Sequence, residues 1–181
     1  MPDYSIRAAT TEDLPSILNI FNDVIAHSTA VYALEPTTLQ ERSAWFEGRV
    51  RASYPVICAA DSTGLIGFAS FGDFRGTWPG YRYTVEHSVH VRADRRGQGV
   101  GSELVRRLFP LALSMDKHVM IGGIDAANEG SKCMHARLGF EPVAHFREVG
   151  HKFGRWLDLV FVQRFLDGPG AARGADDARR P

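Results

Sequence analysis

Apolar residues recur at helical spacing after Thr10, at positions 14, 17, 18, 21, 24 and 25. Because residues three or four apart lie on one face of a helix, this pattern predicts an amphipathic helix. Asp13 follows Thr10 at the spacing of a capping box, which indicates that the helix starts there. The same reasoning predicts helices at 38–51 and 102–115, and a fourth that Asn128 caps and Gly139 ends.

Seven shorter apolar runs alternate with these helices and have the features of strands. They span residues 4–8, 56–60, 65–71, 83–91, 118–124, 141–148 and 156–165. Turn-forming residues at 61–64 join the second and third runs as a hairpin. Since the elements include both hairpins and crossovers, their order predicts a mixed α/β layer structure and not a strict βαβ repeat.

The composition narrows the class of protein. The chain has 181 residues, enough for one domain with a hydrophobic core, which we expect over residues 1–166. Residues 167–181 hold no large apolar side chain and are predicted to form a disordered tail. Lys and Arg together number 21, as do Asp and Glu, and this zero net charge argues against a nucleic-acid partner.

Location and metal content are also predicted from the sequence. No apolar run reaches the roughly 20 residues that span a bilayer. The first residues lack the apolar stretch of a signal peptide, so we expect a cytoplasmic protein without a membrane partner. The two cysteines, Cys58 and Cys133, show no metal-ligand spacing, and no metal is expected.

A glycine cluster at Arg96–Gly101 separates a predicted strand from the helix at 102–115. Glycines let backbone N–H groups approach an anion closely, and a helix start adds the positive end of its dipole. The cluster lacks the lysine of a Walker loop, and both its spacing and the absence of a later acidic residue exclude a dinucleotide fingerprint. Arg96, Gly99 and Gly101 match the pyrophosphate loop of acetyl-CoA enzymes; a glycine-rich turn without a ligand is the alternative.

Further motifs lie at 72–75, 84–89, 128 and 131, 135–140 and 152–158. With the glycine cluster they make the chain resemble the GNAT superfamily of acyl-CoA-dependent N-acetyltransferases, over roughly residues 4–165. Within that superfamily the chain is similar to the phosphinothricin and methionine sulfone or sulfoximine N-acetyltransferases. The resemblance implies an α/β fold with a central twisted mixed sheet of about seven strands, splayed between the fourth and fifth and flanked by about four helices.

The resemblance also implies acetyl-CoA as co-substrate. The fourth-strand backbone at Val89, His90 and Val91 would pair with the pantetheine amides. The pyrophosphate would bind the N–H groups of the loop formed by Gly97, Gln98, Gly99, Val100, Gly101 and Ser102. Asn128 would lie alongside the cofactor near its thioester, and Ser131 would cap the helix or contact the cofactor.

Acetyl transfer to an amine needs a base, because an ammonium ion has no lone pair for attack. The candidate is Glu86, which lies on a valine-rich strand and shares a face with Ser88 and His90. Burial would raise its pKa toward the working pH, provided that a cation such as Arg75 or Arg82 is not too close. A solvated edge carboxylate, or a structural partner for an arginine, is the alternative.

Two other groups could assist the reaction. His135 is the second candidate for proton transfer, although a histidine at this helix position is as readily a packing residue. A free backbone N–H at a bulge in the fourth strand, around Val89, could polarise the thioester carbonyl.

The acceptor is expected to be a small-molecule amine with a carboxylate, which an arginine binds through two parallel hydrogen bonds. Arg75 is the candidate, with an exposed loop arginine as the alternative. In the resembling enzymes this loop, here with Gly76 and Thr77, and the strand residues Glu86, His87 and Ser88 hold the substrate. Gly76 and Thr77 replace what is more often proline and an aromatic residue, which leaves the acceptor's side chain open. Phe21, Asn22 and Tyr32 could close the other wall, or simply be core.

The resemblance also implies a homodimer, with the segment 152–158 near the interface. The predicted function is acetylation of the α-amino group of methionine sulfone, methionine sulfoximine or phosphinothricin, or of a similar compound. Two alternatives stay open: a protein or peptide N-acetyltransferase, which would need an open groove, and a non-catalytic acyl-CoA-binding sensor, which would not need Glu86.

Overall fold

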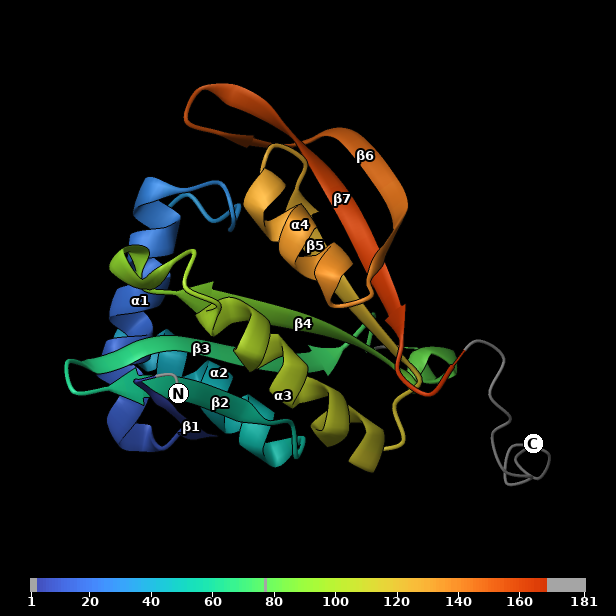
Figure 1. Ribbon diagram of the computed structural model, residues 1–181. Helices are drawn as coiled ribbons and strands as arrows, with labels where there is room; N and C mark the ends of the chain where they lie inside the picture. The colour runs from blue at the N-terminus through green and yellow to red at the C-terminus, as the bar shows by residue number, and fades with distance from the viewer. Residues whose placement is uncertain (1–2, 77, 169–181) are drawn as a thin grey trace.

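A seven-stranded mixed sheet with helices on both faces forms the body of the protein in the computed structural model, which describes residues 3–76 and 78–168 (Figure 1). The strands are β1 (Ser5–Ala8), β2 (Val56–Asp61), β3 (Gly64–Asp73), β4 (Thr84–Val91), β5 (Val119–Asp125), β6 (Glu141–Lys152) and β7 (Arg155–Phe165). Their order in the sheet is β1-β2-β3-β4-β5-β7-β6. The predicted fold is confirmed, although β3 and β6 run further than expected. Residues 169–181 of the predicted tail lie outside the described residues.

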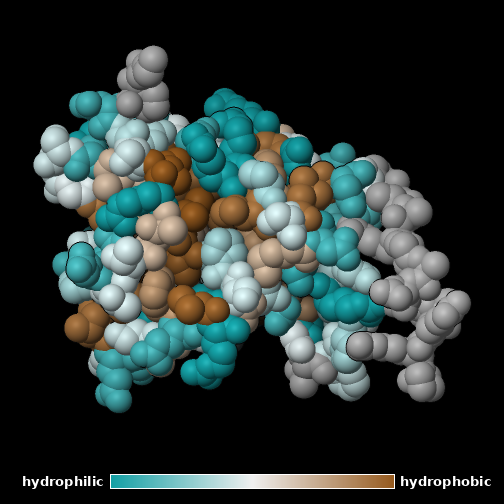
Figure 2. Space-filling model, turned by 90° about the horizontal axis from the view of Figure 1, so that it is seen from below, coloured by the Kyte–Doolittle hydropathy of each residue, from teal (hydrophilic) through white to brown (hydrophobic). Residues whose placement is uncertain are grey.

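Two helices cover each face of the sheet (Figure 1). Helices α1 (Leu14–His27) and α2 (Leu39–Arg51) lie on one face, and α3 (Val100–Ser114) and α4 (Glu129–Arg137) lie on the other. The alternation of side chains along β2 separates two apolar clusters: Val56 and Cys58 pack with α1 and α2, whereas Ile57 and Ala59 pack with α3. Seen from below, hydrophobic side chains gather in a band across the middle of the molecule, between hydrophilic flanks (Figure 2).

Capping pairs lie before the first two helices, at α1 as predicted and at α2 in addition. Thr38 accepts a hydrogen bond from the Glu41 backbone N–H at 3.2 Å, and the Glu41 carboxylate accepts one from the Thr38 backbone N–H at 2.8 Å. The Asp13 carboxylate accepts from the Thr10 N–H at 2.8 Å, in a 3₁₀ turn (Thr11–Asp13) that precedes α1. Both pairs satisfy backbone donors that a helix leaves free at its start.

The sheet opens between β4 and β5. These parallel strands pair at only three positions, Thr84 with Val119, Val85 with Met120 and Glu86 with Ile121. Beyond Glu86 they part, whereas β4 stays paired with β3 in continuous register from Val85 to Val91. The splay is therefore confirmed. The expected bulge around Val89 is wrong, because no register shift interrupts the β3–β4 pairing; the parting of β4 from β5 exposes this backbone instead.

The β6–β7 hairpin closes the top of this opening (Figure 1). Lys152 is buried and donates hydrogen bonds to the carbonyl oxygens of Ser28 at 3.0 Å and Val31 at 2.7 Å, just past the end of α1. Tyr32 donates to the Asp158 carbonyl at 2.9 Å, and its ring lies against Gly150, where a Cβ would meet it at 2.5 Å. The hairpin thus fixes the segment between α1 and α2. In the described residues, none of the helices is long and apolar enough to cross a membrane.

Candidate active site

A cavity of about 510 Å³ lies in the opening between β4 and β5. Helices α1, α2 and α4, the connection between α1 and α2, and Phe68 of β3 contribute the rest of its lining. Eight of the predicted site residues line it: Glu86, His87, Ser88, Val89, His90, Asn128, Ser131 and His135. The splay of the sheet therefore brings together residues of β4 and α4 that are about 40 positions apart in sequence.

Glu86 lies at the inner end of the cavity, at the last residue pair before the strands part. Its carboxylate lies beside Gly123 of β5, where a Cβ would be 3.4 Å from Oε1. It accepts no hydrogen bond from any group in the described part of the chain. Burial raises the pKa of Glu86, and the positive charge of Arg49 lowers it in part. The carboxylate is thus an acceptor free to take a proton.

The cation near Glu86 is Arg49 of α2, and not Arg75 or Arg82, which the sequence suggested. The guanidinium of Arg49 lies directly over Gly72, which is opposite Glu86 in the β3–β4 register. A Cβ at Gly72 would lie 1.4 Å from Nη1 of Arg49, so this packing requires glycine. The absence of a side chain on β3 therefore lets a charge from α2 act on the carboxylate of β4.

His87 and His135 form a buried pair on the opposite face of β4. Their Nε2 atoms lie 3.2 Å apart, and Nδ1 of His135 lies 2.7 Å from the Ser131 carbonyl oxygen. We assign the Nδ1–H of His135 as donor to that carbonyl, so its Nε2 accepts from the Nε2–H of His87. Burial is the main cause that lowers the pKa of His87 to about 3, so the ring is neutral at pH 7. Gly122 makes room for the pair, since a Cβ there would lie 2.9 Å from His87 Nε2.

Asn128 starts α4 as predicted. Its Oδ1 accepts a hydrogen bond from the Ser131 N–H at 3.0 Å, while Asp125 accepts from the Ala127 N–H at 3.0 Å and from the Thr29 hydroxyl. Within the described residues, the Asn128 side-chain nitrogen donates no hydrogen bond, and the residue lines the cavity. This amide is therefore available to a ligand lying between β4 and α4.

The glycine loop lies at the outer end of β4. Gly97 and Gly99 have φ values of 74° and 84°, which only glycine adopts without strain. In the described part of the chain, none of the backbone N–H groups of residues 97–102 donates to a protein acceptor, and α3 begins directly at Val100. Consecutive free N–H groups at the start of a 15-residue helix suit an anion with several oxygens, such as a diphosphate.

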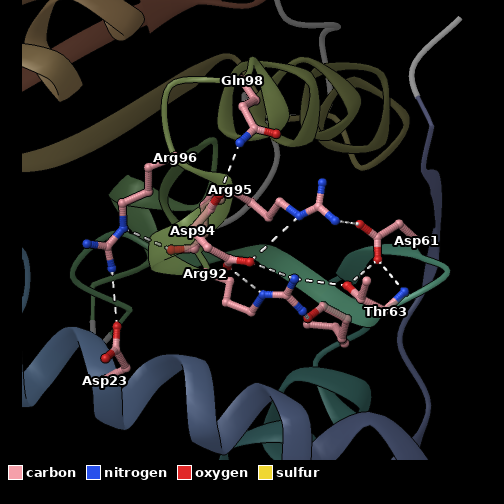
Figure 3. A network of polar contacts seen from close by, with 10 residues as sticks. Asp23, Asp61, Thr63, Arg92, Asp94, Arg95, Arg96 and Gln98 are labelled. Carbon is pink, nitrogen blue, oxygen red and sulfur yellow. Dashed lines mark hydrogen bonds and ion pairs between the residues drawn. The ribbon is translucent and has the colours of Figure 1, made fainter.

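Side chains on both sides hold this loop in place (Figure 3). The ion pairs are Arg95 with Asp61 at 2.5 Å, Arg92 with Asp94 at 2.7 Å and Arg96 with Asp23 at 3.5 Å. Gln98 donates to the Asp94 carbonyl at 3.0 Å. These contacts tie the loop to the β2–β3 turn and to α1. The arginine charges are already paired, so the backbone N–H groups are what the loop offers to an anion.

Other predicted residues lie elsewhere. Arg75 and Gly76 lie in the exposed loop after β3 and do not line the cavity; the Arg75 guanidinium lies 5.8 Å from the centre of the Tyr81 ring. Thr77 lies outside the described residues. Asn22 forms two hydrogen bonds of 2.9 Å with the backbone of Thr37 and so holds the α1–α2 connection. Of the suggested wall residues, Phe21 lines the cavity.

Arg42 of α2 lines the cavity, although the sequence motifs did not single it out. It is buried, with its guanidinium 3.8 Å from the centre of the Phe21 ring. A signal was present: Arg42 follows Leu39 by three residues and precedes Phe46 by four, so the predicted helix already placed it on the apolar face. A charged residue at such a position needs a partner or a ligand.

Comparison with known proteins agrees with this geometry. Residues 4–141 match the acetyltransferase (GNAT) domain family. An L-methionine sulfoximine/L-methionine sulfone acetyltransferase of Pseudomonas aeruginosa is 47% identical over 164 residues, 90% of this chain and 95% of that protein. A phosphinothricin N-acetyltransferase of Streptomyces coelicolor is 33% identical, over 91% of this chain and 97% of that protein. The crystal structure of an acetyltransferase from Salmonella typhimurium with its cofactor acetyl-CoA superposes with a TM-score of 0.90 at 41% identity, covering 96% of this chain and 99% of that one.

The fold and the splayed sheet thus define an acetyltransferase. The chain belongs to the GNAT family, and its close relatives include the N-acetyltransferases of methionine sulfoximine, methionine sulfone and phosphinothricin.

Proposed function

We propose that this chain transfers the acetyl group of acetyl-CoA to the α-amino group of a small amino-acid-like compound of the methionine sulfone, methionine sulfoximine or phosphinothricin type. The observation that carries the proposal is Glu86, a partly buried carboxylate without a protein partner among the described residues, at the inner end of the cavity between β4 and β5. The names of the relatives support the acceptor type.

Acetyl-CoA would be held by the groups that the chain leaves free for it. The N–H groups of residues 97–102 fit its diphosphate, and the β4 backbone at Val89, His90 and Val91 lies where β5 no longer pairs with it. Within the residues that the structure describes, the Asn128 side-chain nitrogen has no acceptor, and Asn128 lines the cavity on the α4 side. When bound, acetyl-CoA would supply an activated acetyl group. These residues would bind acetyl-CoA and orient its thioester.

Glu86 would act as general base. It takes a proton from the acceptor's ammonium group, directly or through a water, and the neutral amine then forms the new C–N bond while the thiolate of coenzyme A leaves. A raised pKa suits this role, because a base works best when its pKa lies near the working pH. His135 has both ring nitrogens engaged, so we assign it to positioning beside Ser131 and His87 and not to the first proton transfer.

The test is thiol release from acetyl-CoA with free amino acids and short peptides as acceptors. Glu86→Gln should lose about 10²–10⁴-fold in kcat, the usual worth of a general base, while acetyl-CoA affinity is kept. Glu47→Gln, an exposed change on α2, is the matched control and should match the wild type.

Two other outcomes of this assay would each indicate a different function. Turnover of peptides alone would replace this proposal with a peptide N-acetyltransferase. Binding of acetyl-CoA without any turnover would indicate a sensor.

We further propose that the chain forms a homodimer through the β6–β7 hairpin. Exposed apolar side chains gather there: Val143, Phe146, Val149, Phe153 and Trp156. The strand β6 is also an edge of the sheet, where backbone groups remain open to a partner. A second copy of the chain would cover these apolar side chains and pair with the open backbone groups of β6.

A further inference from the structure

Arg42 is a buried cation without an oxygen partner in the described part of the chain. The residue is 6% exposed, and its guanidinium carbon lies 3.8 Å from the centre of the Phe21 ring and 4.8 Å from that of the Trp45 ring. Among the described residues its guanidinium forms no hydrogen bond or ion pair, and its Nε is buried without an acceptor. The two ring faces stabilise the positive charge in part, but they leave the N–H donors of the guanidinium without an oxygen acceptor, which costs free energy.

Several other buried or half-buried cations of the chain do find acceptors. Lys152 donates to two carbonyl oxygens, and Arg95 pairs with Asp61. The nearest carboxylate in sequence, Glu41, is already engaged by the Thr38 backbone and side chain. Among the described residues, Arg42 is the sole lysine or arginine that lines the cavity. The missing acceptor is therefore best supplied by a molecule in that cavity.

The position of Arg42 indicates which part of an acceptor it would meet. Arg42 packs on Phe21, whose ring lies 5.2 Å from that of His90. His90 is four residues beyond Glu86 on the same face of β4, roughly 13 Å along the strand. An α-carboxylate shares a carbon with the reacting amine and stays close to it. A group at the far end of the acceptor's side chain can lie closer to Arg42 than the α-carboxylate can.

We propose that Arg42 binds the oxygens of an oxo group at the far end of the acceptor's side chain, such as a phosphinate, sulfone, sulfoximine or carboxylate. The guanidinium fork can donate two parallel hydrogen bonds to such a group. Arg42 thus selects acceptors that carry the oxo group over plain aliphatic amino acids. This inference rests on the proposed function and names the feature of the substrate that the site recognises.

The kinetic test compares acceptors that differ only in these oxygens, methionine sulfone and methionine. Arg42→Met keeps an unbranched apolar chain between the rings and removes the donors. It should lower kcat/KM for methionine sulfone about 10- to 100-fold, the range for a hydrogen bond from a charged group, and should change kcat/KM for methionine less than about 3-fold. Arg51→Met, an exposed change at the end of the same helix, should leave both values unchanged.

Two kinetic results would overturn the proposal. An equal loss with both acceptors would assign Arg42 to a part that they share, and no loss would remove it from recognition. Thermal unfolding separates binding from structure: Arg42→Met removes an unpaired buried charge, so its melting temperature should equal or exceed that of the wild type. A clearly lower melting temperature would show a structural role instead.

A binding measurement distinguishes failure of the proposed function from failure of the proposed role of Arg42. Trp78→Phe with Trp156→Phe leaves Trp45, beside Arg42, as the fluorescent reporter. Methionine sulfone should change its fluorescence saturably, and Arg42→Met should abolish this while acetyl-CoA binding is kept. Arg42-dependent binding without turnover would contradict the proposed function alone. Turnover with binding independent of Arg42, or loss of acetyl-CoA affinity in Arg42→Met, would contradict this inference alone.

Discussion

Two opposing effects set the charge state of Glu86. Burial disfavours the carboxylate and raises its pKa, and the nearby guanidinium of Arg49 favours the carboxylate and lowers it. The balance depends on Gly72, because any side chain there would occupy the place of the guanidinium. Alternation along β4 was enough to single out Glu86 from the sequence. Arg49 could not be found that way, since it reaches Glu86 from another element and across a glycine.

Removal of the Arg49 charge should make Glu86 harder to ionise. In Arg49→Met the pKa of Glu86 rises further, so the base form is lost at a higher pH as the solution is acidified. The acid limb of kcat/KM against pH should therefore shift to higher pH, with the plateau at high pH kept. Arg51→Met is the control from the same helix. An unshifted acid limb, or an equal loss at every pH, would contradict this role.

At the scale of elements, most helix ends could be predicted from residues that are close together in the sequence. The capping pair of Thr10 and Asp13 before α1, the N-cap Asn128 and the terminal Gly139 were predicted correctly because each depends on residues close together in the sequence. The pair of Thr38 and Glu41 at the start of α2 has the same spacing and was not predicted. Element ends that depend on strand pairing were less accurate: β3 reaches Asp73 and β6 reaches Lys152 because their partner strands extend to match them. The supposed bulge failed for the same reason, since pairing partners cannot be read from one strand.

The glycine loop gives a test at this scale. Gly99 has a φ of 84°, and a Cβ there would have nothing within 4 Å, so alanine meets strain and no clash. Gly99→Ala should lower the free energy of unfolding by about 1–2 kcal/mol or turn the loop away from its present conformation. We expect a higher KM for acetyl-CoA with little change in the KM for the acceptor. The matched control is Gly48→Ala on α2, where a Cβ also meets nothing and φ is not positive. Equal KM values for acetyl-CoA in both variants would count against an anion site in the loop.

At the scale of the whole molecule, the cavity is a product of topology. Its lining comes from α1, α2 and their connection, from β3, β4 and β5, and from α4, and the parting of β4 from β5 opens the space between them. The motifs on β4 and α4 could be assigned through the resemblance. The helix spacing put Arg42 and Trp45 on or near the apolar face of α2, but it could not show that a cavity lies beside them, because the elements that pack next to a helix cannot be read from its own sequence. Arg75 shows the reverse: a plausible clamp by residue type that the fold leaves outside the cavity.

The β6–β7 hairpin leads to a prediction about assembly. Val143 and Val149 are 53% and 52% exposed on the edge strand β6. Apolar side chains that stay in contact with water do not stabilise a monomer, whereas burial against a second copy would. Sedimentation velocity at micromolar concentration should give about twice the chain mass of 20.0 kDa. Val143→Asp combined with Val149→Asp should give a monomer, because two carboxylates per copy would be buried without partners. Leu113→Asp on α3, exposed at 42% but remote from the hairpin, should stay dimeric. A wild-type monomer, or a dimer that survives the double substitution, would contradict an interface at this strand.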